Sequence, residues 1–114
     1  MKKYLLLIRE DLEKMKQLSE KEMQECITVM TQWAEGLAAE GILLGGEPLE
    51  AETRYVRPNG HVSTDGPFAE ARESISGYVL IQARDIEHAA EIASGCPHVA
   101  RYNAPIEVRP LMAY

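Results

Sequence analysis

The chain has 114 residues, 46% of them hydrophobic and 26% charged, which is the length and composition of one globular domain. Twelve Lys and Arg against eighteen Asp and Glu give a net charge of -6. This speaks against direct nucleic-acid binding, which needs a basic face for phosphates. No stretch approaches the roughly 20 apolar residues that span a membrane, and the apolar run near the N-terminus has no signal-peptide cleavage site. We therefore expect a single cytoplasmic domain over residues 1–114, with no membrane contact.

The cysteines and histidines show none of the spacings that bind metals. Cys26 and Cys96 have no CxxC spacing and do not form a zinc set. Cys26 falls on the apolar face of a predicted helix, so a buried free thiol is favoured over a disulfide. The histidines, His61, His88 and His98, have no His-x-x-x-His or related spacing. The sequence therefore predicts no metal and no cofactor, and it favours a functional role for His98 no more than for His61.

The first half of the chain predicts a strand and a long helix. Residues 3–9 are almost continuously apolar, which is typical of a strand covered on both faces. Polar residues 10–18 predict a connection with room for a helical turn. Ser19 and Glu22 then have the capping-box spacing that opens a helix, and Gly41 suits its left-handed end. The helix is expected to bury Met23, Cys26, Ile27, Met30, Ala34, Leu37 and Ala38, which recur with a helical period.

The middle of the chain predicts a weak strand and a hairpin. Residues 42–49 (ILLGGEPL) begin with an apolar run, and two adjacent glycines within them indicate a bulge or a close backbone approach. Residues 53–57 and 61–63 predict the two strands of a hairpin, with its turn centred on Asn59 and Gly60.

The last third predicts a strand over residues 75–83, a helix capped by Asp85, and a final strand over residues 106–109. Residues 97–104 are expected to form a loop, because Gly95-Cys96-Pro97 is a helix stop signal. The helix is expected to turn inward Ile86, Ala89, Ala90, Ile92 and Ala93.

The resulting order, strand–helix–strand–hairpin–strand–helix–strand, is that of an α+β ferredoxin-like split βαβ domain with an antiparallel sheet and an added hairpin. Two helices can cover only one face of such a sheet. We therefore expect a second copy of the chain to cover the other face, in a homodimer.

Residues 64–73, TDGPFAEARE, combine a tight turn with carboxylates. The Gly-Pro pair already fixes the bend, so the turn does not require the carboxylate of Asp65, which we expect to point into a cleft as a candidate acid, base or orienting group. Glu70 and Glu73 would complete a cluster whose members raise one another's pKa. The alternative is turn chemistry for Asp65, with both Glu side chains solvated.

Further ligand-binding candidates surround this turn. Phe68 and Tyr78 would line a cleft, although core packing accounts for them equally well. Arg109 ends the last predicted strand, where its guanidinium could bind a carboxylate or phosphate; pairing with a neighbouring Glu is the simpler interpretation. His61 follows the hairpin turn, a few residues from Asp65.

Several runs of the sequence resemble the YCII-related, DGPF-type family of small dimeric α+β proteins. They are YLLLI (residues 4–8), GGEPL (45–49), TDGPFAE (64–70) with Glu73, GY (77–78) and IEVRP (106–110). The DGPF run and the closing EVRP are specific in combination, and the resemblance covers nearly the whole chain. It implies a ferredoxin-like fold that dimerises into a dimeric α+β barrel with a cleft. It also implies a link to extracytoplasmic-function sigma factors, beside which many members are encoded.

The wider YCII family looks built around a His–Asp pair with its His on the first helix, whereas residues 20–40 here contain no His. Only Asp65 carries over from that pattern. We therefore interpret the protein as a homodimer that binds an unknown small molecule in a cleft near the DGPF turn, with a regulatory role. The alternative is a small-molecule enzyme that uses Asp65 as acid or base.

Overall fold

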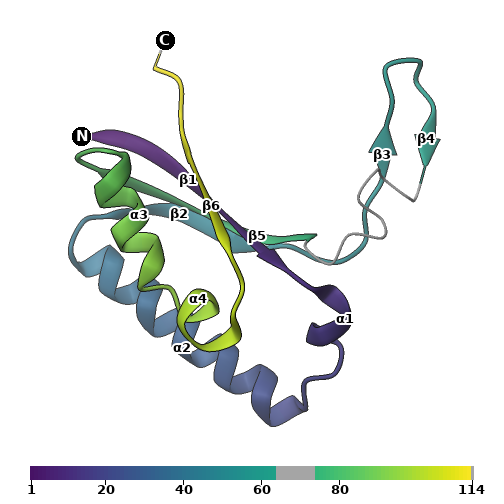
Figure 1. The fold of residues 1–114 in the computed structure, drawn as a ribbon, viewed down its shortest axis with the longest axis horizontal. Helices are drawn as coiled ribbons and strands as arrows, with labels where there is room; N and C mark the ends of the chain where they lie inside the picture. Colours follow the sequence, from purple (N-terminus) through teal and green to yellow (C-terminus); the bar gives the residue numbers. More distant parts are fainter. Residues whose placement is uncertain (64–73, 114) are drawn as a thin grey trace.

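A computed structural model describes residues 1–63 and 74–113, and Figure 1 shows their arrangement. The predictions for Asp65, Phe68, Glu70 and Glu73 lie outside these described residues. The strands are β1 (Lys2–Glu10), β2 (Leu43–Pro48), β3 (Tyr55–Val56), β4 (Val62–Ser63), β5 (Ser74–Ala83) and β6 (Ile106–Pro110). The helices are α1 (Leu12–Met15), α2 (Glu20–Ala39), α3 (Ile86–Ser94) and α4 (Pro97–Tyr102). No helix in the described ranges is both long and apolar enough to cross a bilayer.

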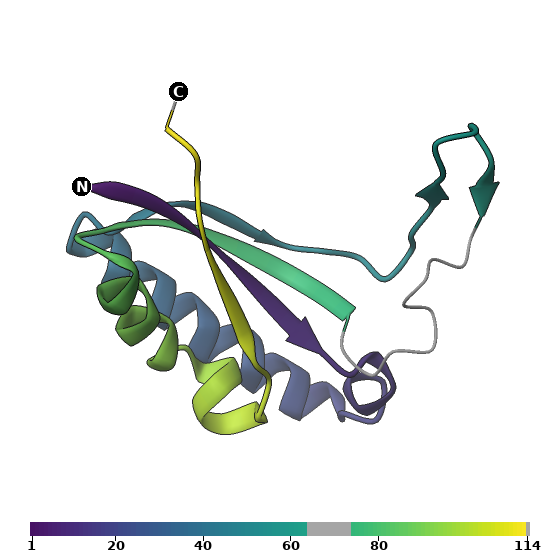
Figure 2. The same ribbon diagram turned by 45° about the horizontal axis from the view of Figure 1, so that its top comes forward.

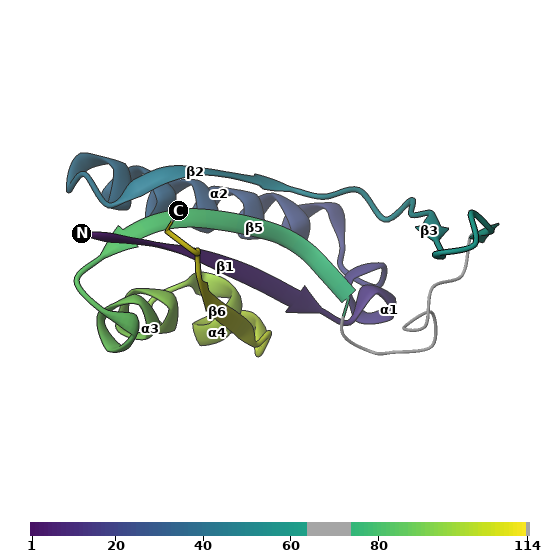
Figure 3. The same cartoon turned by 90° about the horizontal axis from the view of Figure 1, so that it is seen from above.

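Four strands form one sheet in the order β2-β5-β1-β6, and every neighbouring pair is antiparallel. Within residues 1–63 and 74–113, strands β3 and β4 pair with each other alone, as a separate hairpin. Helices α2, α3 and α4 all lie on one face of the four-stranded sheet (Figures 1 and 3). The predicted antiparallel α+β sheet with an added hairpin is therefore confirmed, and its strand order is that of the split βαβ plan.

Helix α2 begins where its capping box predicts. The Ser19 hydroxyl accepts a hydrogen bond from the Glu22 amide, and a Glu22 carboxylate oxygen accepts one from the Ser19 amide, both at 3.1 Å. Beyond its end, Gly41 has a φ of 74°, the left-handed conformation that favours glycine.

The predicted buried face of α2 is partly wrong, because Met23, Ile27 and Ala38 are exposed. Ile27 follows Cys26 directly, and one residue turns the helix by about 100°, so only one of the two can face the sheet.

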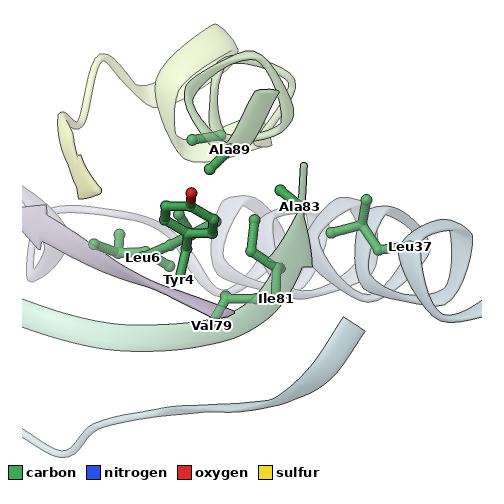
Figure 4. Packing of buried hydrophobic residues seen from close by; sticks show 9 residues of the cluster. Tyr4, Leu6, Leu37, Val79, Ile81, Ala83 and Ala89 are labelled. Atoms are coloured by element: carbon green, nitrogen blue, oxygen red, sulfur yellow. The ribbon is translucent and has the colours of Figure 1, made fainter. Parts of the chain in front are cut away.

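The core lies between the sheet and the helices (Figure 4). Side chains from the two central strands and from α2 and α3 meet there; they include Tyr4, Leu6, Leu37, Val79, Ile81, Ala83 and Ala89. On β1 the buried positions alternate with the half-buried Leu5 and Leu7. The prediction that this strand is covered on both faces is therefore wrong for the single chain, since the helices cross the same face and leave the other open.

The segment after α3 differs from the predicted loop, because Pro97–Tyr102 forms helix α4. Proline lacks an amide hydrogen and has a helical φ, so it suits the first position of a helix as well as a site just after one. Asn103 ends the helix in the left-handed conformation, with a φ of 53°.

On α3 the Asp85 cap is confirmed by a 2.8 Å hydrogen bond from the His88 amide. Ile86 and Ala90 are exposed on α3, contrary to prediction.

The glycines of β2 confirm both structural expectations for them. The register of β2 against β5 shifts between Leu43 and Gly45, which marks an irregularity or bulge. A Cβ atom on Gly46 would lie 2.7 Å from the carbonyl oxygen of Tyr78, closer than a real side chain permits. Strand β2 can therefore pair with β5 at this point only because residue 46 has no side chain.

Candidate functional site

Two polar side chains are buried within the described residues. Glu10 is 4% exposed and His98 is 7% exposed, and His98 Nδ1 lies 2.9 Å from Glu10 Oε1. Burying a carboxylate costs free energy unless a partner compensates for its lost hydration. A buried carboxylate beside a buried imidazole is therefore the first place to seek function.

An irregularity in the central strand pair positions the carboxylate. Glu10 ends β1 on the face that points to the helices, in alternation with Leu6 and Ile8. The register of β1 against β5 shifts between Ile8 and Arg9, which leaves Ser76 without a partner in the ladder. The Ser76 hydroxyl donates a 2.8 Å hydrogen bond to Glu10 Oε1. Bulges often re-aim side chains in this way beside functional sites.

The short helix α4 positions the imidazole. Pro97 starts this helix two residues after Gly95, the C-cap of α3, so His98 lies in its first turn. The amide of Ala104 donates a 2.8 Å hydrogen bond to the His98 carbonyl oxygen, which ties the exit of α4 back to its start. The rings of His98 and Tyr102 are tilted to each other with centroids 6.0 Å apart. Both ends of α4 therefore hold the histidine against the end of β1.

Burial by itself raises the pKa of Glu10, but the contacts with His98 and Ser76 outweigh burial and hold that pKa below its ordinary value of 4.5. Glu10 is therefore a carboxylate at neutral pH. Its second oxygen, Oε2, has no hydrogen-bond partner within residues 1–63 and 74–113, and the His98 Nδ1 contact is not aligned as a hydrogen bond. Buried polar atoms almost always find partners, so this site has unused capacity to bind a hydrogen-bond donor.

A hollow of about 240 Å³ adjoins the pair. It lies between the end of β1, helix α1 and the connection from α4 to β6, and is lined by Arg9, Glu10, Asp11, Lys14, Met15, Tyr102, Asn103, Ala104 and Pro105. Another hollow, of about 350 Å³, lies between α2 and α4, and its lining includes Lys21, Glu25 and Arg101. Since none of its lining residues is buried, we place the candidate site at the hollow beside Glu10.

Two thiols lie in the same region of the domain. Cys96 Sγ is 3.7 Å from Met30 Sδ, and both Cys26 and Cys96 are free and buried, as predicted for Cys26. Burial raises the pKa of each thiol. A protonated thiol is a poor nucleophile, so these cysteines serve packing. Within the part of the chain that the structure describes, no three His, Cys, Asp or Glu side chains gather as a metal site requires.

The comparison with protein families agrees with this architecture. The model of the YCII-related domain matches residues 3–113, nearly the whole chain. The chain belongs to the YCII-related domain family. This confirms the resemblance to the YCII-related family. A search among curated proteins found no match.

In this YCII-related domain the predicted site residues have different placements. Asp65, Phe68 and Glu70 lie outside the described residues. Ser74, which follows that segment, pairs with Glu10, so the chain re-enters the sheet at the candidate site.

The other candidates lie on surfaces away from the hollow. Tyr78 is half-buried on the open face of the sheet, paired with Leu7 of β1. Arg109 is exposed on β6, and its Nη1 donates a 3.0 Å hydrogen bond to Glu107. His61 is exposed on the hairpin. None of these three lines the hollow, and their ligand-binding roles stay predictions.

The Arg109 interaction confirms the simpler interpretation for this residue, pairing with a neighbouring Glu. Glu107 also accepts a hydrogen bond from Arg9, whose Nη2 lies 2.8 Å from Oε1. Hydrogen bonds from Arg9 and then Arg109 lower the pKa of Glu107. The guanidinium of Arg57 lies over the Tyr55 ring, 5.2 Å from its centroid.

The sequence pattern of this YCII-related domain did not single out Glu10, and it favoured His98 no more than His61. A signal for Glu10 exists, because it follows Tyr4, Leu6 and Ile8 at every second residue and so continues the buried face of β1. No comparable signal exists for His98. Its position depends on helix α4, which was not predicted because Gly95-Cys96-Pro97 indicated the end of a helix and a following loop.

Proposed function

We propose that this YCII-related protein binds a small molecule in the hollow beside Glu10 and His98. The observation that carries the proposal is the buried Glu10 carboxylate, whose Oε2 has no partner among the described residues, at the edge of a hollow of about 240 Å³. A ligand group that donates a hydrogen bond to this oxygen would satisfy it. Lys14 and Tyr102 also line the hollow and offer donors to an acceptor on the same ligand.

The test is a thermal shift with a library of metabolites, since a ligand that binds only the folded state raises the melting temperature. Each active compound is then measured with Glu10→Gln, and with Glu25→Gln at the second hollow as a matched control. We expect the shift to shrink with Glu10→Gln and to persist with Glu25→Gln. Equal shifts for both variants, or no shift with any compound at millimolar concentration, would contradict the proposal.

The open face of the sheet supports a homodimer. Leu5, Leu7, Tyr78 and Leu80 are only half-buried there in the single chain, and ladder pairs place them side by side on β1 and β5. Acidic Glu107 and basic Arg109 lie on the neighbouring strand β6. A face with an apolar centre and both charge signs at its rim can complement a second copy of itself. Two such faces packed together would form the dimeric α+β barrel that the family resemblance implies.

Light scattering at micromolar concentration tests this assembly, and a monomeric mass there would defeat it. The net charge of -6 favours protein and small-molecule partners over nucleic acid. A cytoplasmic ligand-binding dimer of this kind would suit the regulatory, sigma-factor-linked role that the resemblance implies.

An enzyme is the second candidate, and the contact between Glu10, His98 and Ser76 favours it. A carboxylate within 2.9 Å of an imidazole can hold and transfer a proton, as general acid–base catalysis requires. Any compound that raises the melting temperature should therefore be incubated with the protein and analysed for products. Turnover that is lost in His98→Gln while binding remains would establish the enzyme. The role of Asp65 in either function stays a prediction.

A further inference from the structure

Residues 53–63, which contain β3, β4 and their turn, form an arm that projects from the body of the domain. Figures 1, 2 and 3 show it beyond the end of the sheet, away from the core helices. The radius of gyration of the chain is 15.4 Å, whereas a compact chain of this length has about 13 Å. The arm therefore extends the molecule beyond the dimensions of a closed domain.

The arm is too small to be stable by itself. Its ladder consists of the pairs Tyr55 with Ser63 and Val56 with Val62, closed by a 2.9 Å hydrogen bond from the Arg57 amide to the His61 carbonyl oxygen. Two-stranded hairpins are marginally stable at best in water. An arm with this ladder needs a surface to pack against.

Its side chains also lack the cover that apolar residues require. Tyr55 is 40% exposed, Val56 is 65% exposed and Val62 is 53% exposed. Burying such side chains is worth about 25 cal/mol per Å² of apolar area, so contact with a surface would stabilise the arm. Val56 and Val62 are cross-strand partners and share one side of the arm, whereas Tyr55 points to the other side. Val56 and Val62 therefore identify the side that packs.

The arm is continuous with the open face of the sheet. It follows β2, an edge strand of that sheet, whose last residue Pro48 pairs with Gly77 of β5. Figure 2 shows the arm rising on the side of the sheet away from the helices. The C-terminal end of the chain, which follows β6, rises on that side as well (Figure 1). A body seated on the open face would lie between these two projections.

Charge favours another copy of the chain as that body. Residues 53–63 contain Arg54 and Arg57 and no Asp or Glu. The adjacent Glu52 pairs with Arg54 at 3.3 Å, which leaves the arm with the positive charge of Arg57 within a chain of net charge -6. A basic arm attracts an acidic body. Twofold symmetry would also let each arm reach the other protomer at the same time.

We propose that the arm clasps the partner protomer of a homodimer, with Val56 and Val62 packed on the partner. The inference rests on the proposed dimer and adds to it: the open faces supply the central contact, and the arms supply a second, basic contact outside it. The dimer is therefore tighter than two sheet faces alone would make it.

Three single substitutions to Glu in the full chain test the clasp by the dimer dissociation constant, measured by sedimentation. Val56→Glu alters the arm and Leu5→Glu alters the open face. Ile27→Glu is the control, at an exposed position of α2. We expect roughly a hundredfold weakening with Leu5→Glu, about tenfold with Val56→Glu, and less than about twofold with Ile27→Glu, since central contacts of an interface dominate its affinity.

The outcomes separate the clasp from the dimer. If Leu5→Glu dissociates the dimer while Val56→Glu matches Ile27→Glu, the dimer stands and the clasp is wrong. If the unaltered chain is monomeric at every concentration, both proposals fail.

Hydrogen exchange of the Arg57 amide gives a second readout, because this amide is bonded only within the arm among the described residues. A clasped arm requires slower exchange above the dimer dissociation constant than below it, and Val56→Glu should remove the difference. Equal exchange rates of the Arg57 amide in monomer and dimer would overturn the clasp. The arm would then be exposed to solvent or bind a different protein.

Discussion

The two faces of the four-stranded sheet carry similar apolar residues but differ in what covers them. On the helix-covered face, Leu6 and Ile81 are fully buried, and the buried Glu10 lies at its end. On the open face, Leu5 and Leu80 are half-buried, and the charges of Arg9 and Glu107 pair in contact with solvent. The same strands thus make a core on one side and an available surface on the other. The first should determine the stability of the single chain, and the second its association.

The sharpest contrast is between two neighbouring leucines of β1. Leu6→Ala should destabilise the domain by about 2–5 kcal/mol, the usual range for a buried leucine that leaves a cavity. Leu5→Ala, on the open face, should cost less than about 1 kcal/mol in the monomer. Urea denaturation at a concentration below dimer formation measures both values. Equal losses would show that the open face is also a core within one chain.

Substitution of the buried Glu10 tests how much the stability of the helix-covered face depends on a charged group. Glu10→Gln keeps the shape of the side chain but removes its charge, and it should cost roughly 1–3 kcal/mol at pH 7. Because the folded-state pKa of Glu10 lies below 4.5, its stabilisation is present above that value and is lost as the pH falls through the folded pKa. The difference in stability between parent and variant should therefore shrink below pH 4.5. A difference independent of pH from 3 to 7 would show that charge has no part in it.

Substitution of Ser76, at the irregularity in β5, should have a smaller effect on stability than substitution of Glu10. Ser76→Ala removes the hydroxyl that donates to Glu10, and we expect a loss of about 1 kcal/mol, the scale of one hydrogen bond. The pKa of Glu10 should rise, because this hydrogen bond helps to lower it. An NMR titration of the Glu10 carboxyl measures that shift, and Ser94→Ala on the exposed side of α3 is the control. An unchanged pKa would mean that His98 alone holds the carboxylate.

The smallest effect on monomer stability is expected for substitution of Arg9 on the open face. Arg9→Gln removes the first donor to Glu107, whose side chain is partly exposed, and exposed ion pairs contribute little to stability. The pKa of Glu107 should nevertheless rise toward its ordinary value, since the hydrogen bond from Arg9 is the main cause of its lowering. The titration of Glu107 by NMR detects this. A marked loss of monomer stability would instead give the pair a structural role and blur the contrast between the two faces.

Features with local signals were predictable from the sequence. The Ser19 and Glu22 capping box, the Asp85 cap and the hairpin turn at Gly60 each depend on residues a few positions apart, and the structure shows each of them. The antiparallel sheet followed from the order of such elements. Helix α4 was missed because Pro97 serves both as a stop for one helix and as the first residue of the next.

The candidate site depends on contacts between distant parts of the chain. Glu10 and His98 meet only because α4 packs against the end of β1, and the short-range pattern around His98 contains no information about that contact. Whether Leu5 and Leu7 are covered is decided by the path of the helices rather than by the strand itself. The same limit explains why the exposure of Ile27 was not predicted: periodicity gives the apolar stripe of a helix but not its width.

The irregular strand β2 also restricts how the protein can assemble. It is an edge strand, and a regular edge strand has unpaired backbone N–H and C=O groups that can pair with a strand of another molecule. Its shifted register near Gly45 and its terminal Pro48 interrupt that template, and the opposite edge strand β6 likewise ends in a proline, Pro110. Strand-by-strand growth into fibres is therefore disfavoured at both edges, so a concentrated solution of the protein should form closed assemblies rather than extended polymers.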